Sequence, residues 1–469
     1  MDASFIQYAA RIARVPFTLD SSVTIEGSDP VHPSPLRLGD GTAALLGMIG
    51  ASVDDIWHAQ TGRRQRIRID HTHAALGISS AWLLRVNGEL AFTALRSPTS
   101  FVDGSYLTAD GRTVRLMTGT FLHLATPVLE LLDCPDEPDA IAAAVARWSA
   151  ADLEAALTAR GMTGVIVREH AEWLEHPQGR FLHESPAVEI TRIGDAPARA
   201  LPGGDRPLSG LRVLDATRVI AGPTIARTLA EFGADVLHVE SPNIPDGGAT
   251  RADTGHGKLQ SFVDLATDEG RATMAELART ADVFSQSYRA GSMAARGFGP
   301  EAVAALNPGI IYVSETAYGH GGPWHEKRGF DGNVQSASGI EMLNRRAAPP
   351  SPVAMAMNDY GTGYWGAFGV LQALKRRAVE GGSWHVKVAL GQTASWYLRL
   401  GAPHDPSRAK SADELYALAD QYSEAHDSDY GLLRRLRPII QLSETPSSWE
   451  RRTALPGSHP AAWPAPVAV

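Results

Sequence analysis

The sequence predicts an α/β protein with an open, doubly wound, Rossmann-like parallel sheet domain and a smaller α+β domain. Strand and helix patterns alternate from residue 208 to about residue 316, which is typical of such a sheet. The stretch GDAPARALPGGDRPLSG, rich in proline and glycine, separates this part from a differently patterned segment before it. A chain of 469 residues is long enough for two or three domains.

Residues 1–200 form the first predicted segment. Apolar helical runs flank the alternating stretch RRQRIRID, and a small α+β unit is expected at about 101–200. There, SYLTADGRTVRLM has two alternating runs around an Asp-Gly pair, which predicts a β-hairpin. AIAAAVARWSAADLEAALTARG predicts a helix, a serine cap and a second helix that ends at a glycine.

Residues 201–207 are predicted to be a linker, and residues 208–469 the second segment. LRVLDATRVIAGPTIARTLAEFGADVLHVESP predicts a buried strand, a Gly-Pro turn, a helix and a parallel second strand. TDEGRATMAELARTADVFSQSY and GPEAVAALNPGIIYVSETAYG each predict a helix followed by a strand. The turn IAGPTIA lacks the three glycines of a dinucleotide-binding fingerprint, so no nicotinamide cofactor is expected.

The composition excludes several classes of protein. The net charge is −9 and no basic stripe stands out, so nucleic acid is not an expected partner. No apolar run reaches the ~20 residues that cross a bilayer, and the N-terminal stretch lacks a signal-peptide core, so a cytoplasmic protein is expected. The single cysteine, Cys134, excludes a disulfide framework and a cysteine-based zinc cluster.

Two stretches share an order of parts. GDGTAALLGMIGASVDDIWHAQTGRRQRIRIDHTHAALG and NDYGTGYWGAFGVLQALKRRAVEGGSWHVKVALGQTASW each contain an aspartate, a Gly-Thr pair, a long helix, a turn, an alternating strand and a second helix. The shared order favours an internal duplication, in which Asp40 is the counterpart of Asp359.

Asp359 has two interpretations on physical grounds. An aspartate just before Gly-Thr at a helix start is most simply a cap that accepts backbone N–H bonds. Alternatively, it is a carboxylate nucleophile at the positive end of a helix, where Gly361 and Gly363 let a bulky substrate come close.

Other polar groups give weaker signals. His71 and His73 lie two residues apart, but no third metal ligand is evident nearby, so no metal site is predicted. GHGGPWHEKRGFD places His320, His325 and Asp331 in a segment after a strand, and GHGGP is either a plain turn or a backbone cradle for a ligand. The chain has no GxSxG motif, which argues against an α/β-hydrolase.

Four segments, in order, carry a family resemblance. LSGLRVLDATRVIAGPTIARTLAEFGADVLHVESP, GKLQSFVDLATDEGR, ADVFSQSYRAGSMAARG and LNPGIIYVSETAYGHGGP resemble successive motifs of family III CoA-transferases. This family contains formyl-CoA transferase, carnitine CoA-transferase and the α-methylacyl-CoA racemases. The resemblance runs from Leu208 to about Trp396. Residues 1–200 resemble the later portion of a member, so the chain resembles two incomplete tandem copies.

The resemblance implies a CoA-transferase that moves CoA from an acyl-CoA thioester to a carboxylic acid through an aspartyl-CoA thioester. Asp359 matches the family's nucleophilic aspartate, and an ionised carboxylate needs no separate base to attack. Coenzyme A is then a substrate, and no permanently bound cofactor is expected. The positions that match the family's CoA contacts are Val219, Ala221, Lys258, Ser287, Tyr288 and Arg289.

Departures from the family leave alternatives open. The racemases pair their aspartate with a histidine, and Phe330 stands at that position, so racemisation is not favoured. An acyl-CoA racemase or lyase and a non-catalytic CoA-binding protein remain the alternative functions. Members form interlocked dimers, so the resemblance implies either a homodimer or a pseudo-dimer within one chain. One active site is expected, at Asp359 and not at Asp40.

Overall fold

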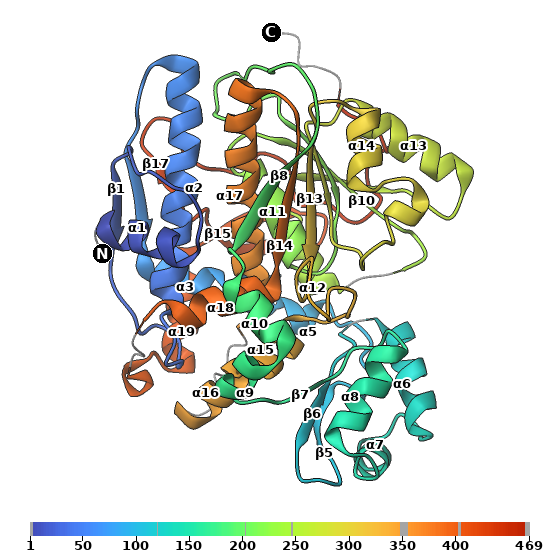
Figure 1. Cartoon of the computed structure of the whole chain (residues 1–469). Coiled ribbons are helices and arrows are strands. Elements are labelled where there is room, and N and C mark those ends of the chain that lie inside the picture. Colours follow the sequence, from blue (N-terminus) through green and yellow to red (C-terminus); the bar gives the residue numbers. More distant parts are fainter. Residues whose placement is uncertain are drawn as a thin grey trace.

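The structure is a computed structural model that describes residues 3–119, 121–201, 203–244, 247–347, 355–401 and 405–464. A central α/β body is covered on one side by the N-terminal helices and strands, and the small domain lies at one end of the body (Figure 1). Among the described residues, no helix combines the length and the apolar character needed to cross a membrane.

A seven-stranded sheet forms the centre of the molecule. In order across the sheet, its strands are β11 (Lys258–Phe262), β10 (Asp235–Glu240), β9 (Arg212–Ala216), β12 (Val283–Gln286), β13 (Ile311–Thr316), β14 (Ser383–Ala389) and β8 (Val188–Gly194). Neighbours from β11 to β14 are parallel, and β8 is antiparallel to β14. The parallel strands follow the 3-2-1-4-5-6 order of a doubly wound dinucleotide-binding sheet. The predicted sheet is confirmed.

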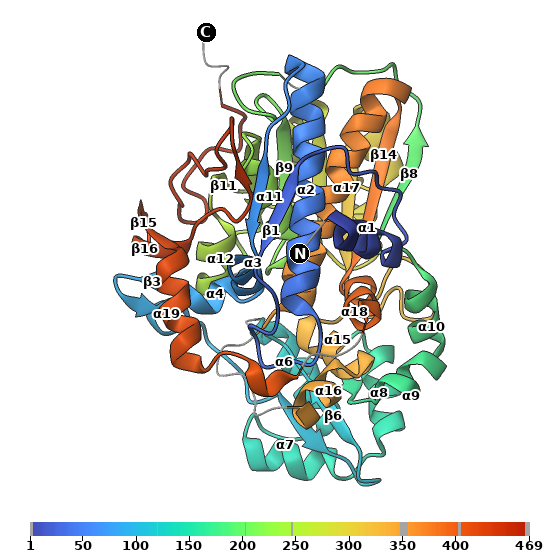
Figure 2. The ribbon, with the colours of Figure 1, turned by 90° about the vertical axis from the view of Figure 1, so that its left-hand side faces the viewer.

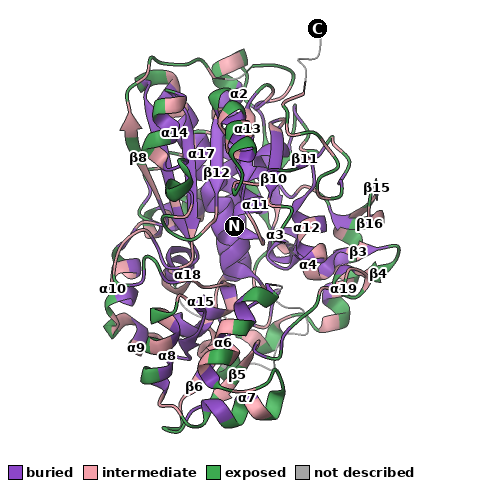
Figure 3. Ribbon diagram, turned by 90° about the vertical axis from the view of Figure 1, so that its right-hand side faces the viewer, coloured by how far each residue is buried: buried purple, intermediate pink, exposed green. Residues whose placement is uncertain are grey.

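Apolar side chains alternate between the two faces of this sheet, as the period of a strand requires. On β13, Ile311 and Val313 belong to one apolar layer, whereas Tyr312 belongs to the other. The covering helices are α11 (Ala221–Ala230) and α17 (Met357–Glu380) on the first face, and α13 (Asp268–Arg279) and α14 (Pro300–Leu306) on the second. Helices α11 and α17 are buried in the middle of the molecule (Figure 3).

The N-terminal layer lies outside α17. It consists of α1 (Ala3–Ile12), β1 (Val23–Glu26), α2 (Leu38–Thr61), β2 (Ile67–Asp70) and α3 (His71–Gly77). Helix α2 packs on α17, and the two run side by side in both views (Figures 1 and 2). Strand β1 is parallel to β2, which also pairs antiparallel with β17 (Gln441–Leu442).

This layer repeats the arrangement around α17. There, β13 is parallel to β14, β14 pairs antiparallel with β8, and α18 (Leu390–Arg399) follows β14 as α3 follows β2. The correspondence is consistent with a duplication, which stays a prediction. The linker at 201–207 divides the chain in sequence but not in space, because β8 precedes it and joins the sheet of the second segment.

The small domain has the predicted hairpin and helix pair. Its elements are β5 (Gly104–Leu107), β6 (Thr113–Leu116), β7 (Val165–Ile166), η1 (Leu122–Leu124), α6 (Ala125–Leu132), α7 (Pro138–Val145) and α8 (Ala150–Ala159). Gly111 has a φ of 72° in the hairpin turn, a conformation that glycine adopts without strain. Ser149 caps α8 by accepting the N–H of Asp152, and Gly161, with a φ of 65°, follows its end.

Short elements connect these parts. They are α4 (Ser80–Leu83), β3 (Arg85–Val86), β4 (Glu89–Leu90), α5 (Ala91–Ala94), α9 (His170–Glu175), α10 (Pro177–Glu184), α12 (Gly248–Thr254), η2 (Ala294–Arg296), α15 (Asp331–Ser338), α16 (Ile340–Ala347), η3 (Pro406–Arg408), α19 (Ala412–Tyr422), β15 (Ser423–Ser428) and β16 (Gly431–Leu436). Strands β15 and β16 form a sheet with β3 and β4, so the C-terminal part also pairs with the first segment.

Candidate active site

A cavity of about 290 Å³ lies at the carboxyl ends of β9, β12 and β13. Ligands bind at this edge in doubly wound sheets, where the loops after the two central strands diverge. Five of the predicted CoA-contact residues line the cavity together with Asp359: Val219, Ala221, Ser287, Tyr288 and Arg289. The small domain and its flanking loops supply another wall: Phe121, His123, Leu124 and Thr163. One chain therefore provides both sides of the cavity.

Asp359 lies in the first turn of α17 and is 8% exposed. The helix is capped by Asp331, whose carboxylate accepts the backbone N–H groups of Asn358 and Asp359 at 3.0 and 3.1 Å. Asp331 also accepts from the Asn358 amide at 2.7 Å and the Gln335 amide at 2.9 Å. Within the described part of the chain, no hydrogen bond or ion pair reaches the side chain of Asp359. The simpler interpretation of Asp359 as a cap is thus not what the structure shows.

The glycines after Asp359 have a different role from the one expected. A Cβ on Gly361 would lie 2.7 Å from Thr393 of α18, and one on Gly363 would lie 2.5 Å from Thr224 of α11. Both positions therefore permit close helix packing, and the expectation that they make room for substrate is wrong.

Three carboxyl groups meet near the start of α17. Burial, followed by the charges of Asp331 and Glu315, raises the pKa of Asp359 well above its usual value. Burial also raises the pKa of Asp331, although its four hydrogen bonds oppose the rise. Glu315, at the carboxyl end of β13, is 9% exposed, and burial raises its pKa to about 8. At neutral pH this cluster therefore retains protons that isolated carboxyls would lose.

Basic side chains line the same cavity. They are His123, Arg218, Arg289, His325, Lys327 and Arg328. Burial and the charge of Arg289 lower the pKa of Arg328, which indicates two neighbouring guanidinium groups. Burial lowers the pKa of Lys327 to about 8. Such groups bind phosphate and carboxylate oxygens.

The first βα turn is shaped by backbone strain. Val219 has a φ of 69°, a left-handed conformation that a β-branched residue rarely adopts. The N–H of Arg218 donates to Ser287 Oγ at 2.8 Å, which ties this turn to the loop after β12. The Arg218 guanidinium lies over the Phe121 ring at 4.7 Å, which connects the turn to the opposite wall.

Lys258 is separate from this group. It is 1% exposed, and its Nζ donates to Asp215 Oδ2 at 2.8 Å and to the carbonyl of Pro223 at 2.7 Å. Burial by itself would raise the pKa of Asp215, but the charges of Lys258 and His238 lower it below its usual range. The buried pair supports the turn that carries Val219. Contact between Lys258 and a CoA phosphate stays a prediction.

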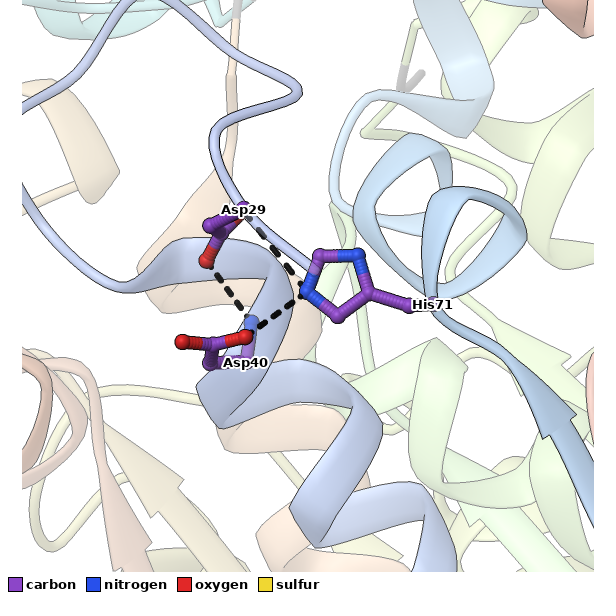
Figure 4. Close-up of side chains that lie close together, drawn as sticks. All are labelled: Asp29, Asp40 and His71. Atoms are coloured by element: carbon purple, nitrogen blue, oxygen red, sulfur yellow. Dashed lines mark hydrogen bonds and ion pairs between the residues drawn. The ribbon is translucent and has the colours of Figure 1, made fainter. Parts of the chain in front are cut away.

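The start of α2 contains Asp40, the predicted counterpart of Asp359 (Figure 4). Asp40 Oδ2 accepts from Arg37 Nε at 2.8 Å, and Oδ1 lies 3.0 Å from His71 Nε2. Burial would raise its pKa, but the bonds from His71 and Arg37 lower it well below the usual range. Asp29 accepts the N–H groups of Gly39 and Asp40 at 3.2 and 2.8 Å, as Asp331 does for α17.

Asp29, Asp40 and His71 place three possible metal-ligand atoms within 4.8 Å of one another. Each of these residues already has protein partners, and Arg37 supplies positive charge to Asp40. His73 turns away and stacks on Tyr422 at 4.7 Å. His71 and His73 thus do not converge, and the carboxylate of Asp40 is held by Arg37 and His71.

The segment after β13 is a packed turn. Gln178 of α10 donates to the carbonyls of Tyr318 and Gly321 and accepts the N–H of Trp324. Ser314 Oγ lies 2.7 Å from both His320 Nε2 and His385 Nε2, and burial lowers the histidine pKa values to about 4 and about 3. Of the three residues singled out in this segment, His325 lines the cavity and Asp331 caps α17.

Sequence reasoning missed Glu315, Arg328 and the wall from the small domain. Glu315 is the second-last residue of the run IIYVSET, and a carboxylate near the end of an otherwise buried strand was the available signal. Phe330 lines the cavity and stacks on Phe121, with ring centroids 6.1 Å apart. An aromatic pair thus occupies the place where the racemases have a histidine.

Comparisons with known proteins identify the family of the chain. The model of CoA-transferase family III matches residues 208–415. The acetyl-coenzyme A transferase nodX of Hypoxylon pulicicidum is 31% identical, over 82% of this chain and 72% of that protein. An acyl-CoA transferase of Gibberella moniliformis is 29% identical, over 81% and 74% of the two chains.

Other relatives match a shorter part. The succinate–glutarate CoA-transferase of Agrobacterium fabrum is 33% identical over 40% of this chain and 52% of its own length. A solved structure of a CAIB/BAIF family protein from Brucella suis is 26% identical, covers 49% of this chain and 65% of that chain, and has a TM-score of 0.37. From the extended match to the Hypoxylon protein, together with the family model, it follows that the chain belongs to CoA-transferase family III and is an enzyme of that family.

Proposed function

We propose that the enzyme transfers CoA from an acyl-CoA thioester to a carboxylic acid, with Asp359 as the nucleophile. The observation that carries this proposal is that one aspartate caps the start of α17 and a different one faces the cavity. Asp331 satisfies the backbone N–H groups of the helix, so the carboxyl group of Asp359 is left to face the cavity. The positive end of the helix stabilises its ionised form.

The transfer proceeds through acyl groups on Asp359. Its carboxylate oxygen attacks the thioester carbonyl, the C–S bond breaks, and a mixed anhydride and CoA thiolate form. The thiolate attacks the Asp359 carbonyl carbon, which releases the first acid as a carboxylate and leaves an aspartyl-CoA thioester. The acceptor carboxylate then repeats these two steps in reverse order and leaves as its CoA thioester. One thioester is exchanged for another, so no further energy source is needed.

The cations of the cavity are suited to CoA. Arg218, Arg289 and Arg328 offer guanidinium groups to the phosphates of the nucleotide, and bidentate bonds from arginine to phosphate are strong. The raised pKa of Asp359 moves its ionisation to higher pH, so the transfer rate should rise with pH until Asp359 is fully ionised.

The test is the intact mass of the protein after incubation with acetyl-CoA, succinyl-CoA and octanoyl-CoA, followed by hydroxylamine. A CoA-sized adduct that hydroxylamine removes is expected for the wild type and for Asp40→Asn, and is expected to be absent from Asp359→Asn. Asp40→Asn is the matched control because both residues occupy the first turn of a capped helix of 24 residues.

Two outcomes would contradict the proposal. An adduct that survives in Asp359→Asn but disappears in Asp40→Asn would move the nucleophile to α2. Exchange of the α-proton of the acyl group in deuterated water, without any adduct, would favour racemase chemistry.

A further inference from the structure

Glu315 is a carboxyl group that the transfer steps above do not use. It follows Ile311 and Val313 on the same face of β13, so its side chain points toward the layer of α11 and α17. It lines the cavity that contains Asp359 and is close enough to that residue to raise its pKa. Across the described residues, no hydrogen bond or ion pair is formed with its carboxyl group.

The three carboxyl groups differ in where a proton can reside. Asp331 accepts four hydrogen bonds, and donors of that kind favour an ionised carboxylate. Asp359 must be ionised to attack. Buried carboxyls close to one another do not all ionise, so in the form of the site that reacts the proton resides on Glu315, which, like Asp359, accepts no hydrogen bond from the described residues.

The transfer chemistry has a use for that proton. A thiolate leaves when the anhydride forms, and in a buried cavity an unpaired anion is costly. A cysteine thiol has a pKa of about 8.5, and the pKa of Glu315 is about 8. An acid whose pKa lies near that of the leaving group can give up the proton and take it back with little bias.

We propose that Glu315 is a further catalytic residue, which gives its proton to the departing CoA sulfur and recovers it when that sulfur attacks Asp359. This inference rests on the proposed transfer function. In the first step, the Asp359 carboxylate attacks the acyl thioester and forms the anhydride. The Glu315 carboxylic acid gives its proton to the departing sulfur, so CoA leaves as a thiol and Glu315 becomes a carboxylate. In the second step, the thiol returns its proton to Glu315 as sulfur bonds to the Asp359 carbonyl, and the first acid leaves as a carboxylate.

Other titratable groups also face the cavity and set the background of any pH profile. Besides Asp359, they are Arg218, Tyr288, Arg289, His325, Glu326, Lys327 and Arg328, and Asp331 adds its charge from the start of α15. His123 completes the set, and burial, then Arg328 and Arg218, lower its pKa. The experiment therefore compares the pH–rate profiles of variants at position 315. It does not assign the rise or fall of one profile to one residue.

The kinetic test follows formation of the Asp359 adduct from acetyl-CoA and succinyl-CoA in single turnovers. Glu315→Gln keeps the shape and a hydrogen-bond donor but cannot transfer a proton, so the rate should fall about 100-fold at neutral pH. In the wild type the rate should fall again above about pH 8, as Glu315 loses its proton, and this fall should be absent from Glu315→Gln. Glu315→Asp, which retains an acid, should recover part of the rate. Glu269→Gln, on the exposed start of α13, is the control and should match the wild type.

A second measurement does not depend on activity. Infrared difference spectra of wild type minus Glu315→Gln should show the carbonyl band of a neutral carboxyl at about pH 6.5 and a carboxylate band at about pH 9.5. A carboxylate already present at about pH 6.5 would overturn the inference whichever donors react. So would a Glu315→Gln variant with the rate and pH profile of the wild type. If the wild type forms no adduct, the transfer proposal fails, and the spectra still decide whether Glu315 holds the proton.

Discussion

Helices α2 and α17 begin in nearly the same way and lead to opposite electrostatic results. Each has 24 residues and an aspartate at its third position, and each is capped by a second aspartate from an earlier segment. Around Asp40 the neighbours are a guanidinium and an imidazole, whereas around Asp359 they are two further carboxyls. The helix end alone therefore does not make a nucleophile. The side chains brought to it decide whether the carboxylate is held in place or available for reaction.

The largest expected effect is on activity. Asp359→Asn should lower CoA transfer by about 10⁴-fold or more, because no other group replaces a missing nucleophile. Asp40→Asn should retain transfer to within a few-fold, measured as the steady-state rate of acyl-CoA formation. Comparable losses in both variants would remove the distinction between the two helix ends.

The pH dependence of stability should have opposite signs at the two ends. Asp40 has a lowered pKa in the folded chain, so its contribution is present above the unfolded value and is lost as pH falls. Glu315, in the Asp359 cluster, has a folded pKa of about 8 against roughly 4.3 in an unfolded chain. Between these values the folded chain holds a proton that the unfolded chain releases, so stability falls as pH rises.

Glu315→Gln should remove this slope, which is at most about 1.4 kcal/mol per pH unit. Urea titrations from about pH 5 to pH 8 should show the variant gaining stability over the wild type as pH rises. A constant difference in unfolding free energy between the two proteins across that range would mean that the pKa of Glu315 is not raised in the folded chain.

Stability at neutral pH should separate the two aspartates. Asp40→Asn removes the anionic partner of Arg37 and leaves His71 facing only the more distant Asp29, so the free energy of unfolding should fall by about 2 kcal/mol. Asp359→Asn removes a buried carboxyl that no cation compensates, so stability should be unchanged or higher. A higher free energy of unfolding for Asp40→Asn would contradict the view that Asp40 is held in place by its partners at the start of α2.

The smallest effect is expected from Arg37→Gln. The Arg37 side chain is 29% exposed, so solvent screens its attraction to Asp40, and the loss of stability should be about 0.5–1 kcal/mol. The loss should shrink at high salt, since the pair is partly solvated. The dependence of this stability loss on salt is measured from the unfolding midpoint at increasing salt concentrations. Arg345→Gln, which removes an exposed i,i+4 ion pair, is the control.

The sequence was sufficient for the main sheet because local patterns are repeated there. Each strand and helix between residues 208 and 316 has its own apolar period, and parallel pairing follows from the alternation. Pairing between distant segments has no such local signal, so β8 at the sheet edge and β17 beside β2 were not predicted.

The site shows the same limit. Asp359 was singled out because its motif, contiguous with a glycine-rich helix, matches the family's aspartate, and the residues of the first turns after β9 and β12 lie together in the cavity. Lys258 looks like a surface cation in sequence, yet its partner Asp215 lies 43 residues away and draws it into the core. Glu315 and the Phe121 wall depend on tertiary packing. A carboxylate near the end of a buried strand marks Glu315 as unusual, but nothing in the local sequence shows that it lies near Asp359.

The two walls of the cavity belong to one polypeptide, with Phe121 on one and Asp359 on the other. Their encounter is an intramolecular event governed by folding, so dilution does not separate them. Specific activity should accordingly stay constant as the enzyme is diluted to nanomolar concentrations. A cavity with both walls on one chain predicts that the activity per molecule does not depend on how much enzyme is present.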